Sequence, residues 1–147
     1  MKKIFFILVA VLFATSGFSQ VSAKVIHLND NSFKDKVFDF EKGDEWVFKG
    51  DRPVIVDFYA TWCGPCKRVA PVLEELQKEY GESIQIYKVD TDKSPLVSGA
   101  FGIKSIPSFL FIPAKGKPTM AKGALPKETF VKAIKDVLGV NAPESIK

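Results

Sequence analysis

Residues 53–60, Pro-Val-Ile-Val-Asp-Phe-Tyr-Ala, form a nearly continuous run of β-branched, aromatic and other apolar side chains. Such a run is typical of a strand buried on both faces, and strands of this kind occupy the middle of sheets that helices cover. Cysteines follow at 63 and 66, and apolar residues then recur with helical spacing over 69–76. The fold must therefore lead a central strand through a cysteine pair into an amphipathic helix.

Further apolar patterns predict the rest of that fold. Capping residues, prolines and glycines bound four more strands, at 25–28, 84–89, 108–112 and 118–122, and three more helices, at about 29–38, 95–101 and 126–138. The helical connections suit parallel crossovers, whereas the short loop over 113–117 suits an antiparallel hairpin. We therefore predict an α/β protein with a central mixed sheet of about five strands flanked by about four helices.

The first 23 residues have a different pattern. Two lysines precede an apolar run over 4–14, and small or polar residues follow up to Ala23. This order is typical of a cleaved signal peptide, so we predict a mature domain over 24–147. An uncleaved membrane anchor is the alternative, but about 11 apolar residues fall well short of the ~20 that a membrane-spanning helix needs. We expect no stable membrane insertion after cleavage.

The charge of the mature chain argues against a nucleic-acid partner. Removing residues 1–23 takes away two lysines and no acidic residue, so the formal charge falls from +4 to +2. Domains that bind nucleic acid are usually far more basic.

We expect the last residues, from about 140 to 147, to form a flexible tail.

Cys63 and Cys66 are the two cysteines of the chain. A disulfide between them would constrain the unfolded chain little, because the stabilisation grows with the length of the closed loop. Half of a zinc site is the alternative, but it needs further Cys, His or acidic ligands, and His27 is the one histidine. The spacing therefore suits thiol–disulfide chemistry, and we expect no metal.

The position of this pair suggests how it reacts. Cys63 lies between a buried strand and a helix, where unpaired N–H groups and the helix dipole favour the thiolate. Cys66 is close enough to attack Cys63 once Cys63 has formed a mixed disulfide with a substrate. Gly64 allows a close turn, and Pro65 fixes φ and removes a donor from the first helical turn. We expect this dipeptide to tune the surroundings of the thiolate.

The hexapeptide over 62–67, Trp-Cys-Gly-Pro-Cys-Lys, is preceded by Val-Asp-Phe-Tyr-Ala over 56–60. Together these segments resemble the active site of the thioredoxin family. Matching blocks over 25–28, 102–107 and 123–125 extend the resemblance from about residue 24 to residue 139. The resemblance implies the thioredoxin fold for nearly all of the mature chain.

Carried onto these positions, the resemblance implies that Cys63 is an exposed nucleophile and Cys66 a buried resolving thiol. Asp57 matches a buried acid of the family, and desolvation would raise its pKa so that it could accept the Cys66 proton. An aspartate that only satisfies backbone donors at a strand end is the alternative. Lys88 matches a family lysine that approaches this acid and would oppose the shift, or else is a solvated strand lysine.

The resemblance also implies a substrate groove. Pro107 matches the cis-proline of the family, which lies beside the cysteines and presents backbone to an extended substrate. Ile106 would then offer backbone hydrogen bonds, and Trp62 and Gly123 would border the groove. Ordinary packing, or for Gly123 a simple turn, is the alternative.

The chain departs from the family pattern in an elongated connection over 39–52, which is charged and interrupted by glycines. Its candidate strand is Trp46-Val47-Phe48. The connection either caps an edge strand, which the general need to protect edges favours, or adds a surface for a partner.

We therefore expect a thiol–disulfide oxidoreductase that reduces or exchanges disulfides in exported proteins, in the bacterial periplasm and as a monomer. Its redox group is the Cys63–Cys66 disulfide, so no cofactor is expected. An exported reductant needs recharging, which implies a membrane-bound electron donor. A net oxidant or isomerase is one alternative, because the Cys-Gly-Pro-Cys motif favours reduction whereas export favours oxidation. A non-catalytic binding module is the other alternative.

Overall fold

The computed structural model of the protein describes residues 23–43 and 45–146. The predicted signal peptide over 1–23 therefore lies outside the described residues, apart from its last position. The described chain forms one five-stranded sheet in the order β1-β3-β2-β4-β5. The strands are β1 Ile26–Leu28, β2 Val54–Tyr59, β3 Gln85–Asp90, β4 Ser108–Ile112 and β5 Thr119–Lys122.

The sheet is mixed, as predicted. β3 pairs in parallel with both β1 and β2, whereas β4 pairs antiparallel with β2 and with β5. The apolar run that begins at Pro53 contains β2, and β2 lies in the centre of the sheet with all but its last residue buried. The thioredoxin fold expected from the sequence is confirmed.

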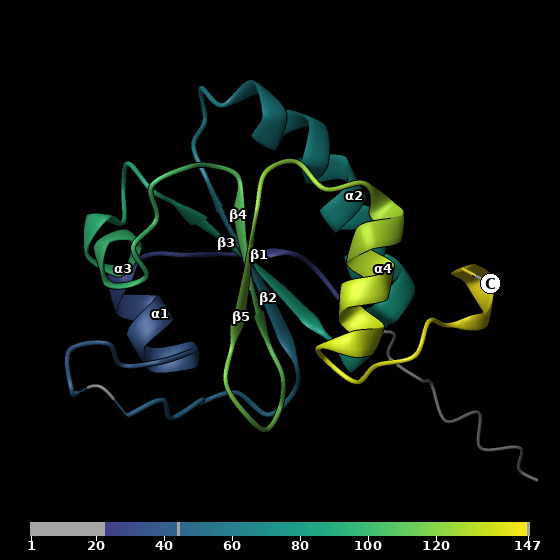
Figure 1. The fold of residues 1–147 in the computed structure, drawn as a ribbon, viewed down its shortest axis with the longest axis horizontal. Helices are drawn as coiled ribbons and strands as arrows, with labels where there is room; N and C mark the ends of the chain where they lie inside the picture. Colours follow the sequence, from purple (N-terminus) through teal and green to yellow (C-terminus); the bar gives the residue numbers. More distant parts are fainter. Residues whose placement is uncertain (1–22, 44, 147) are drawn as a thin grey trace, which may run out of the picture.

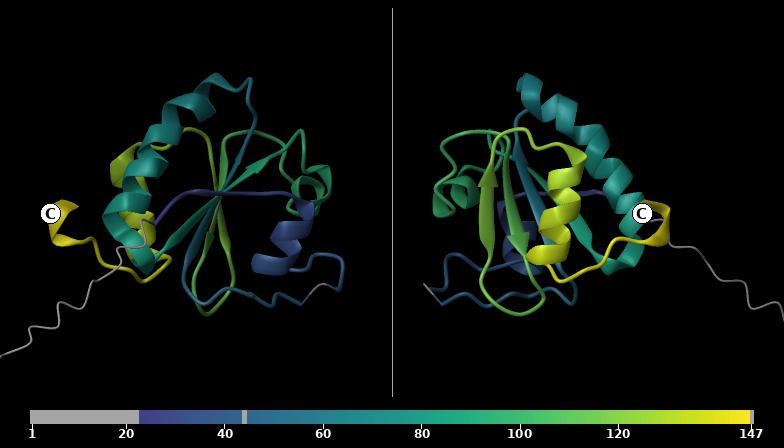
Figure 2. Two further views of the ribbon diagram at one scale, coloured as in Figure 1. Left: turned by 180° about the vertical axis from the view of Figure 1, so that it is seen from behind. Right: turned by 45° about the vertical axis from the view of Figure 1, so that its right-hand side comes forward.

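Helices cover both faces of the sheet, as Figure 1 shows. The helices α1, Asp30–Lys36, and α3, Pro95–Ala100, lie on one side, and α2, Gly64–Tyr80, and α4, Lys127–Asp136, lie on the other. The turned views in Figure 2 show α2 and α4 together on their face. Two short 3₁₀-helices, η1 Gly81–Ser83 and η2 Glu144–Ile146, complete the described elements.

Each layer of helices encloses its own apolar core. One core joins residues of α2 and α4 to Ile55, Ile86, Phe109 and Phe111 of the sheet. The other joins α1 and α3 to Val54, Val56 and Phe58. Because successive side chains of a strand point to opposite faces, the alternation along β2 decides which helices each residue meets. Asp57 therefore lies on the face of Ile55, which α2 covers.

Local sequence signals explain where the helices begin and end. Asn29 caps α1 through its side chain, which accepts the Ser32 N–H, while the Ser32 hydroxyl accepts the Asn29 N–H. α2 begins after Cys63 and continues through Pro71 to Gly81, whose φ of +54° suits glycine. The predicted helical ranges agree with the structure to within a few residues at their ends.

The predicted strand at 46–48 is wrong. The described part of the connection contains no strand, and its backbone bond from the Lys49 N–H to the Val37 carbonyl leads to the end of α1. The Trp46 ring packs against Phe38, with centroids 4.6 Å apart, and also meets Phe101. Burial of the indole in the core of α1 and α3 has therefore prevailed over strand pairing. No described backbone hydrogen bond joins this connection to β1 or β5, although Trp46 and Phe48 share an apolar cluster with Leu28 and Met120 of those strands. The edge-cap interpretation remains a prediction.

The stretch predicted as a flexible tail makes contacts of its own. Val140, Ala142 and Ile146 pack against the core formed by α2 and α4. The chain end therefore lies beside these helices, as the C-terminal label in Figure 1 indicates.

Candidate active site

The two cysteines form a disulfide at the first turn of α2. Cys63 is the N-cap residue, and its sulfur accepts a hydrogen bond of 3.2 Å from the Cys66 N–H. Gly64 and Pro65 are the first two residues of the helix, so the bend between the cysteines occurs where no intrahelical donor is lost. The amide that faces Cys63 Sγ would also stabilise a thiolate at that position.

The burial of Cys63 differs from the expectation of an exposed nucleophile. Its side chain is 4% exposed and that of Cys66 is 3% exposed. The two sulfurs are bonded to each other, and Ala60, Tyr59 and Ile106 pack around them. In this oxidised state the pair is covered on most sides, whereas Trp62, Gly64 and Pro65 beside it are exposed.

A buried ion pair lies behind the cysteines. Asp57 on β2 stands opposite Lys88 on β3, and Lys88 Nζ donates to Asp57 Oδ2 at 2.5 Å. Burial raises the pKa of the Asp57 carboxyl above its ordinary value, and the Lys88 ammonium offsets only part of that effect. Asp57 Oδ1 is buried without a hydrogen-bond partner among the described residues. This oxygen is therefore available to accept a proton.

Tyr59 supports the same pair. The Lys88 ammonium lies over the Tyr59 ring, 4.3 Å from the ring centroid, which is a favourable cation–π arrangement. The Tyr59 hydroxyl is hydrogen-bonded to His27 Nδ1 on β1 at 3.2 Å. Sequence reasoning did not identify Tyr59 or His27, because the contacts depend on the order of three neighbouring strands.

A small cleft lies between Lys88 of this pair and the resolving cysteine. It has a volume of about 110 Å³, and its lining includes Cys66, Lys88, Tyr59 and Lys67. That space is large enough for water, which needs roughly 10–15 Å³ of accessible volume. Protons can therefore reach the neighbourhood of Cys66 from solvent.

The predicted groove residues come together beside the disulfide. The Ile106–Pro107 peptide bond is cis, and Ile106 packs against the buried cluster of Ala60, Cys63 and Cys66. Neither backbone group of Ile106 has a hydrogen-bond partner within residues 23–43 and 45–146. The Gly123 N–H donates to the Pro107 carbonyl at 2.8 Å, and the φ of Gly123 is +88°, a conformation that favours glycine.

Trp62 borders the same region and has a partner that sequence reasoning missed. Its side chain is 69% exposed, and its indole N–H donates to Asp92 Oδ2 at 2.8 Å. Asp92 follows the end of β3 just as Trp62 follows the end of β2, and these strands are parallel neighbours. Because parallel strands end at the same edge of a sheet, this shared placement is the signal that could have predicted the contact.

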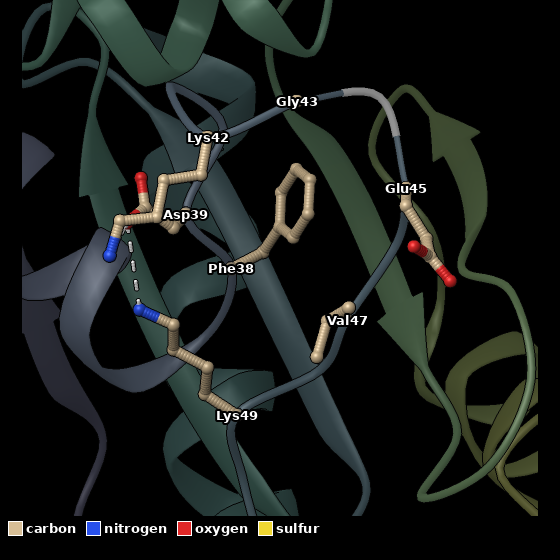
Figure 3. A pocket seen from close by; sticks show the side chains of 7 residues that line it. All are labelled: Phe38, Asp39, Lys42, Gly43, Glu45, Val47 and Lys49. Carbon is tan, nitrogen blue, oxygen red and sulfur yellow. Dashed lines mark ion pairs between the residues drawn. The ribbon is translucent and has the colours of Figure 1, made fainter.

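A second hollow of about 340 Å³ lies in the elongated connection. Figure 3 shows the Phe38 ring in it, between Val47 and the charged pair of Asp39 and Lys42. Val47 is an exposed apolar residue. The idea that the connection adds a partner surface remains a prediction.

Comparison with known proteins agrees with this geometry. The sequence model of the thioredoxin family matches residues 24–136. The chain belongs to the thioredoxin family. A thioredoxin of Borreliella burgdorferi is 51% identical to it over 114 residues, which cover 78% of this chain and 97% of that protein. The M-type chloroplastic thioredoxin of Spinacia oleracea is 39% identical over 120 residues, which cover 82% of this chain and 61% of that protein.

A solved structure supports the same assignment. The chloroplastic thioredoxin z matches the fold with a TM-score of 0.68 and 25% identity, over 80% of this chain and 96% of its own. As a thioredoxin, the protein is a thiol–disulfide oxidoreductase that acts on disulfide-containing proteins, and the family needs no cofactor because the cysteine pair itself carries the electrons.

Within the described ranges, no group of three His, Cys, Asp or Glu side chains could hold a metal ion. No described helix has the length and hydropathy required to cross a membrane.

Proposed function

We propose that this thioredoxin reduces or exchanges disulfides in exported proteins of the bacterial periplasm. The observation that carries the proposal is the cysteine pair at the N-terminus of α2, placed over the buried Asp57–Lys88 pair and beside Ile106 and Pro107. The apolar leader that precedes the mature domain supports the compartment.

The reaction takes place in two exchanges. In the reduced protein the Cys63 thiolate attacks one sulfur of a substrate disulfide, forms a mixed disulfide and releases the other substrate sulfur as a thiolate. Cys66 then loses its proton and attacks Cys63 Sγ, which releases the second substrate sulfur and closes the Cys63–Cys66 disulfide. Two electrons pass to the substrate, whose two sulfurs leave as thiols once protonated.

Asp57 is the proposed acceptor of the Cys66 proton. A carboxyl group whose pKa is raised by burial is a stronger base than an ordinary aspartate, and its Oδ1 has no other described partner. The cleft beside Cys66 and Lys88 would let water approach the Cys66 thiol. The Lys88 ammonium favours the carboxylate and so limits how far burial raises the pKa of Asp57.

The groove residues are proposed to hold the substrate. The free backbone groups of Ile106 would pair with an extended substrate segment beside its disulfide. Trp62 and Gly123 would border that segment, and cis-Pro107 would keep the Ile106 backbone facing the cysteines. Gly64 and Pro65 set the surroundings of the Cys63 thiolate.

Trapping tests the mechanism. In a Cys66→Ser variant the mixed disulfide cannot be resolved, so we expect exported proteins to remain attached to Cys63 in extracts of the bacterial periplasm and to be released by dithiothreitol. Mass spectrometry identifies them. A Cys63→Ser variant, which keeps Cys66, is the matched control and should trap far less. Equal trapping by both variants would contradict the assigned roles.

Export is tested by fractionation. We expect the full chain to reach the periplasm of a bacterial host with an intact mass that places its first residue near Lys24. A version that lacks residues 2–23 should remain in the cytoplasm. A full-length product that stays in the cytoplasm or membrane would contradict the signal-peptide prediction.

The direction of electron flow is tested by equilibrium with glutathione. We expect a reduction potential near the ~−270 mV of thioredoxin, so that the protein acts as a reductant recharged by a membrane-bound donor. A potential at or above the ~−180 mV of protein disulfide isomerase would favour a net oxidant or isomerase instead. Full biological activity of a Cys63→Ser, Cys66→Ser double variant would favour a binding module.

A further inference from the structure

Four exposed basic residues lie within two positions in the sequence of Cys66, Ile106 or Gly123. Lys67 and Arg68 lie in the first turns of α2, Lys104 lies two residues before Ile106, and Lys122 directly precedes Gly123. We call these four residues the cationic rim. They come from three segments that are far apart in the sequence.

Contacts in the core of the site bring the three segments together. Ile106 packs against the cysteines at the start of α2, and the Gly123 N–H donates to the Pro107 carbonyl. The ends of these segments meet at the upper edge of the molecule in Figure 1. Arg68 also reaches back toward the motif, because its Nη1 lies 4.0 Å from the point where a Cβ on Gly64 would stand.

The cationic rim is not neutralised by the protein itself. None of its four residues forms an ion pair with any acidic residue that the structure describes. Asp92 accepts the Trp62 N–H and so places one negative charge beside the rim. One negative charge against four positive charges leaves a net positive charge. Ion pairs hold eight of the fourteen other basic residues that the structure describes, namely Lys34, Lys42, Lys49, Arg52, Lys88, Lys93, Lys127 and Lys132. The other six, which include Lys78, Lys115 and Lys135, lie outside the rim.

Stability of the fold does not account for this arrangement. Cations near a helix N-terminus oppose the helix dipole, and α2 has no acidic residue in its first turn to compensate Lys67 and Arg68. The mature chain carries a formal charge of only +2, and four cations without a described ion pair lie close in sequence to the groove residues, with Asp92 as the acid that contacts Trp62. A field of one sign around a binding cleft steers ligands of the opposite sign.

We propose that the cationic rim selects disulfide substrates that carry acidic residues beside the bridged cysteine. This inference rests on the proposed function, since it names the substrates that the groove prefers. Acidic side chains on either side of a bound cysteine would lie near Arg68 and Lys104 on one side and Lys122 on the other. The attraction accelerates formation of the encounter complex and leaves the exchange chemistry unchanged.

Single-turnover kinetics with matched peptides test the inference. The protein is reduced, freed of reductant and mixed with one of two peptides that carry the same disulfide between flanking Glu or flanking Lys residues. Neutral bis(2-hydroxyethyl) disulfide serves as a third substrate. Reactions are quenched with acid and alkylated, and the oxidised protein is measured by mass spectrometry at about 20 mM and about 500 mM ionic strength.

Two variants with the same change in net charge separate the rim from the charge of the whole protein. The rim variant is Arg68→Glu, Lys104→Glu, Lys122→Glu, which spares Lys67 because Lys67 lines the cleft beside Cys66. The control variant is Lys78→Glu, Lys115→Glu, Lys135→Glu, which changes exposed residues near the end of α2, in the β4–β5 turn and near the end of α4. Far-UV circular dichroism and urea midpoints confirm that both variants fold.

We expect the wild type to react at least ~10-fold faster with the acidic peptide than with the basic one at low ionic strength, and the ratio to approach one at high ionic strength. The rim variant should invert the ratio, whereas the control variant should keep it. The inference is overturned if the neutral disulfide is reduced but the two peptides react at equal rates. It is also overturned if the rim variant keeps the wild-type ratio of the two rates. Failure to reduce the neutral disulfide would overturn the proposed function itself.

Discussion

Replacing Lys88 by methionine would isolate the role of its ammonium group. The methionine side chain is unbranched and keeps most of the apolar stem that packs beside the Tyr59 ring. The substitution therefore removes one charge and leaves Asp57, which is 1% exposed, without its 2.5 Å partner. A buried carboxylate without a partner destabilises the folded state, and breaking a buried pair typically costs about 3–5 kcal/mol.

Protonation of Asp57 sets a ceiling on that loss. In the unfolded chain the Asp57 carboxyl has its ordinary pKa of 3.8. Keeping it protonated in the folded protein costs about 1.4 kcal/mol for each unit by which the pH exceeds 3.8. The ceiling therefore lies below about 4.4 kcal/mol at pH 7 and below about 1.6 kcal/mol at pH 5, because the raised pKa of Asp57 means that the wild type already bears part of this cost. We expect Lys88→Met to lower the free energy of unfolding by less than about 4.4 kcal/mol at pH 7 and by less than about 1.6 kcal/mol at pH 5, with the larger loss at pH 7.

Urea unfolding of the oxidised protein at both pH values measures this difference, provided that the m-value stays constant. Lys132→Met is the matched control, because Lys132 is 76% exposed in its pair with Asp136 and should change stability by less than ~1 kcal/mol. A double variant Asp57→Asn, Lys88→Met should lose the pH dependence. Equal losses at pH 5 and pH 7 in Lys88→Met would refute the reasoning, because they would indicate lost packing and not an unpaired charge.

Three further predictions concern single positions. The raised pKa of Asp57 means that its contribution to stability is fully present below pH 3.8 and is lost as the pH rises through its folded-state pKa. The stability of Asp57→Asn relative to the wild type should therefore rise between pH 4 and pH 8 by about 1.4 kcal/mol for each unit of that elevation, as urea unfolding at both pH values measures. Phe130 is fully buried and packs edge-on against Phe109 with centroids 4.9 Å apart, so Phe130→Ala should cost about 3–5 kcal/mol and lower Tm by roughly 10–20 °C in calorimetry; a loss below ~1 kcal/mol would contradict the core assignment. The Trp46 N–H is buried without a described partner, so Trp46→Phe should change the free energy of unfolding by less than ~1 kcal/mol, whereas Trp46→Ala should lower it by about 2–4 kcal/mol. Denaturant unfolding measures both values, and equal effects would show that the Trp46 ring does not pack as described.

Much of the fold could be predicted from local patterns. The apolar run before the cysteines fixes a buried strand, and the helical spacing after them fixes α2, because both patterns depend on residues only two to four positions apart. Cys63 was therefore placed correctly at a helix N-terminus. The resemblance of 62–67 to the thioredoxin motif then supplied the topology that spacing alone leaves open.

The failures have a common physical cause. Trp46-Val47-Phe48 has the composition of a strand, but its indole finds a better burial site between Phe38 and Phe101, and that choice depends on where α1 and α3 pack. The sequence predicts an exposed Cys63, but the residue is buried in a cluster with Ala60 and Cys66, against which Ile106 packs from a segment about forty residues later in the chain. Neither contact leaves a trace in the spacing of neighbouring residues.

The sequence by itself determined the chemistry of this protein: a cysteine pair with a glycine and a proline between them, at the start of a helix that follows a buried strand. Only the tertiary structure decided what surrounds that pair. The register of β2 against β3 sets Asp57 opposite Lys88, and the order of β1, β3 and β2 brings His27 to Tyr59. Register and strand order follow from the burial of both faces of the sheet at once, which no single segment can encode.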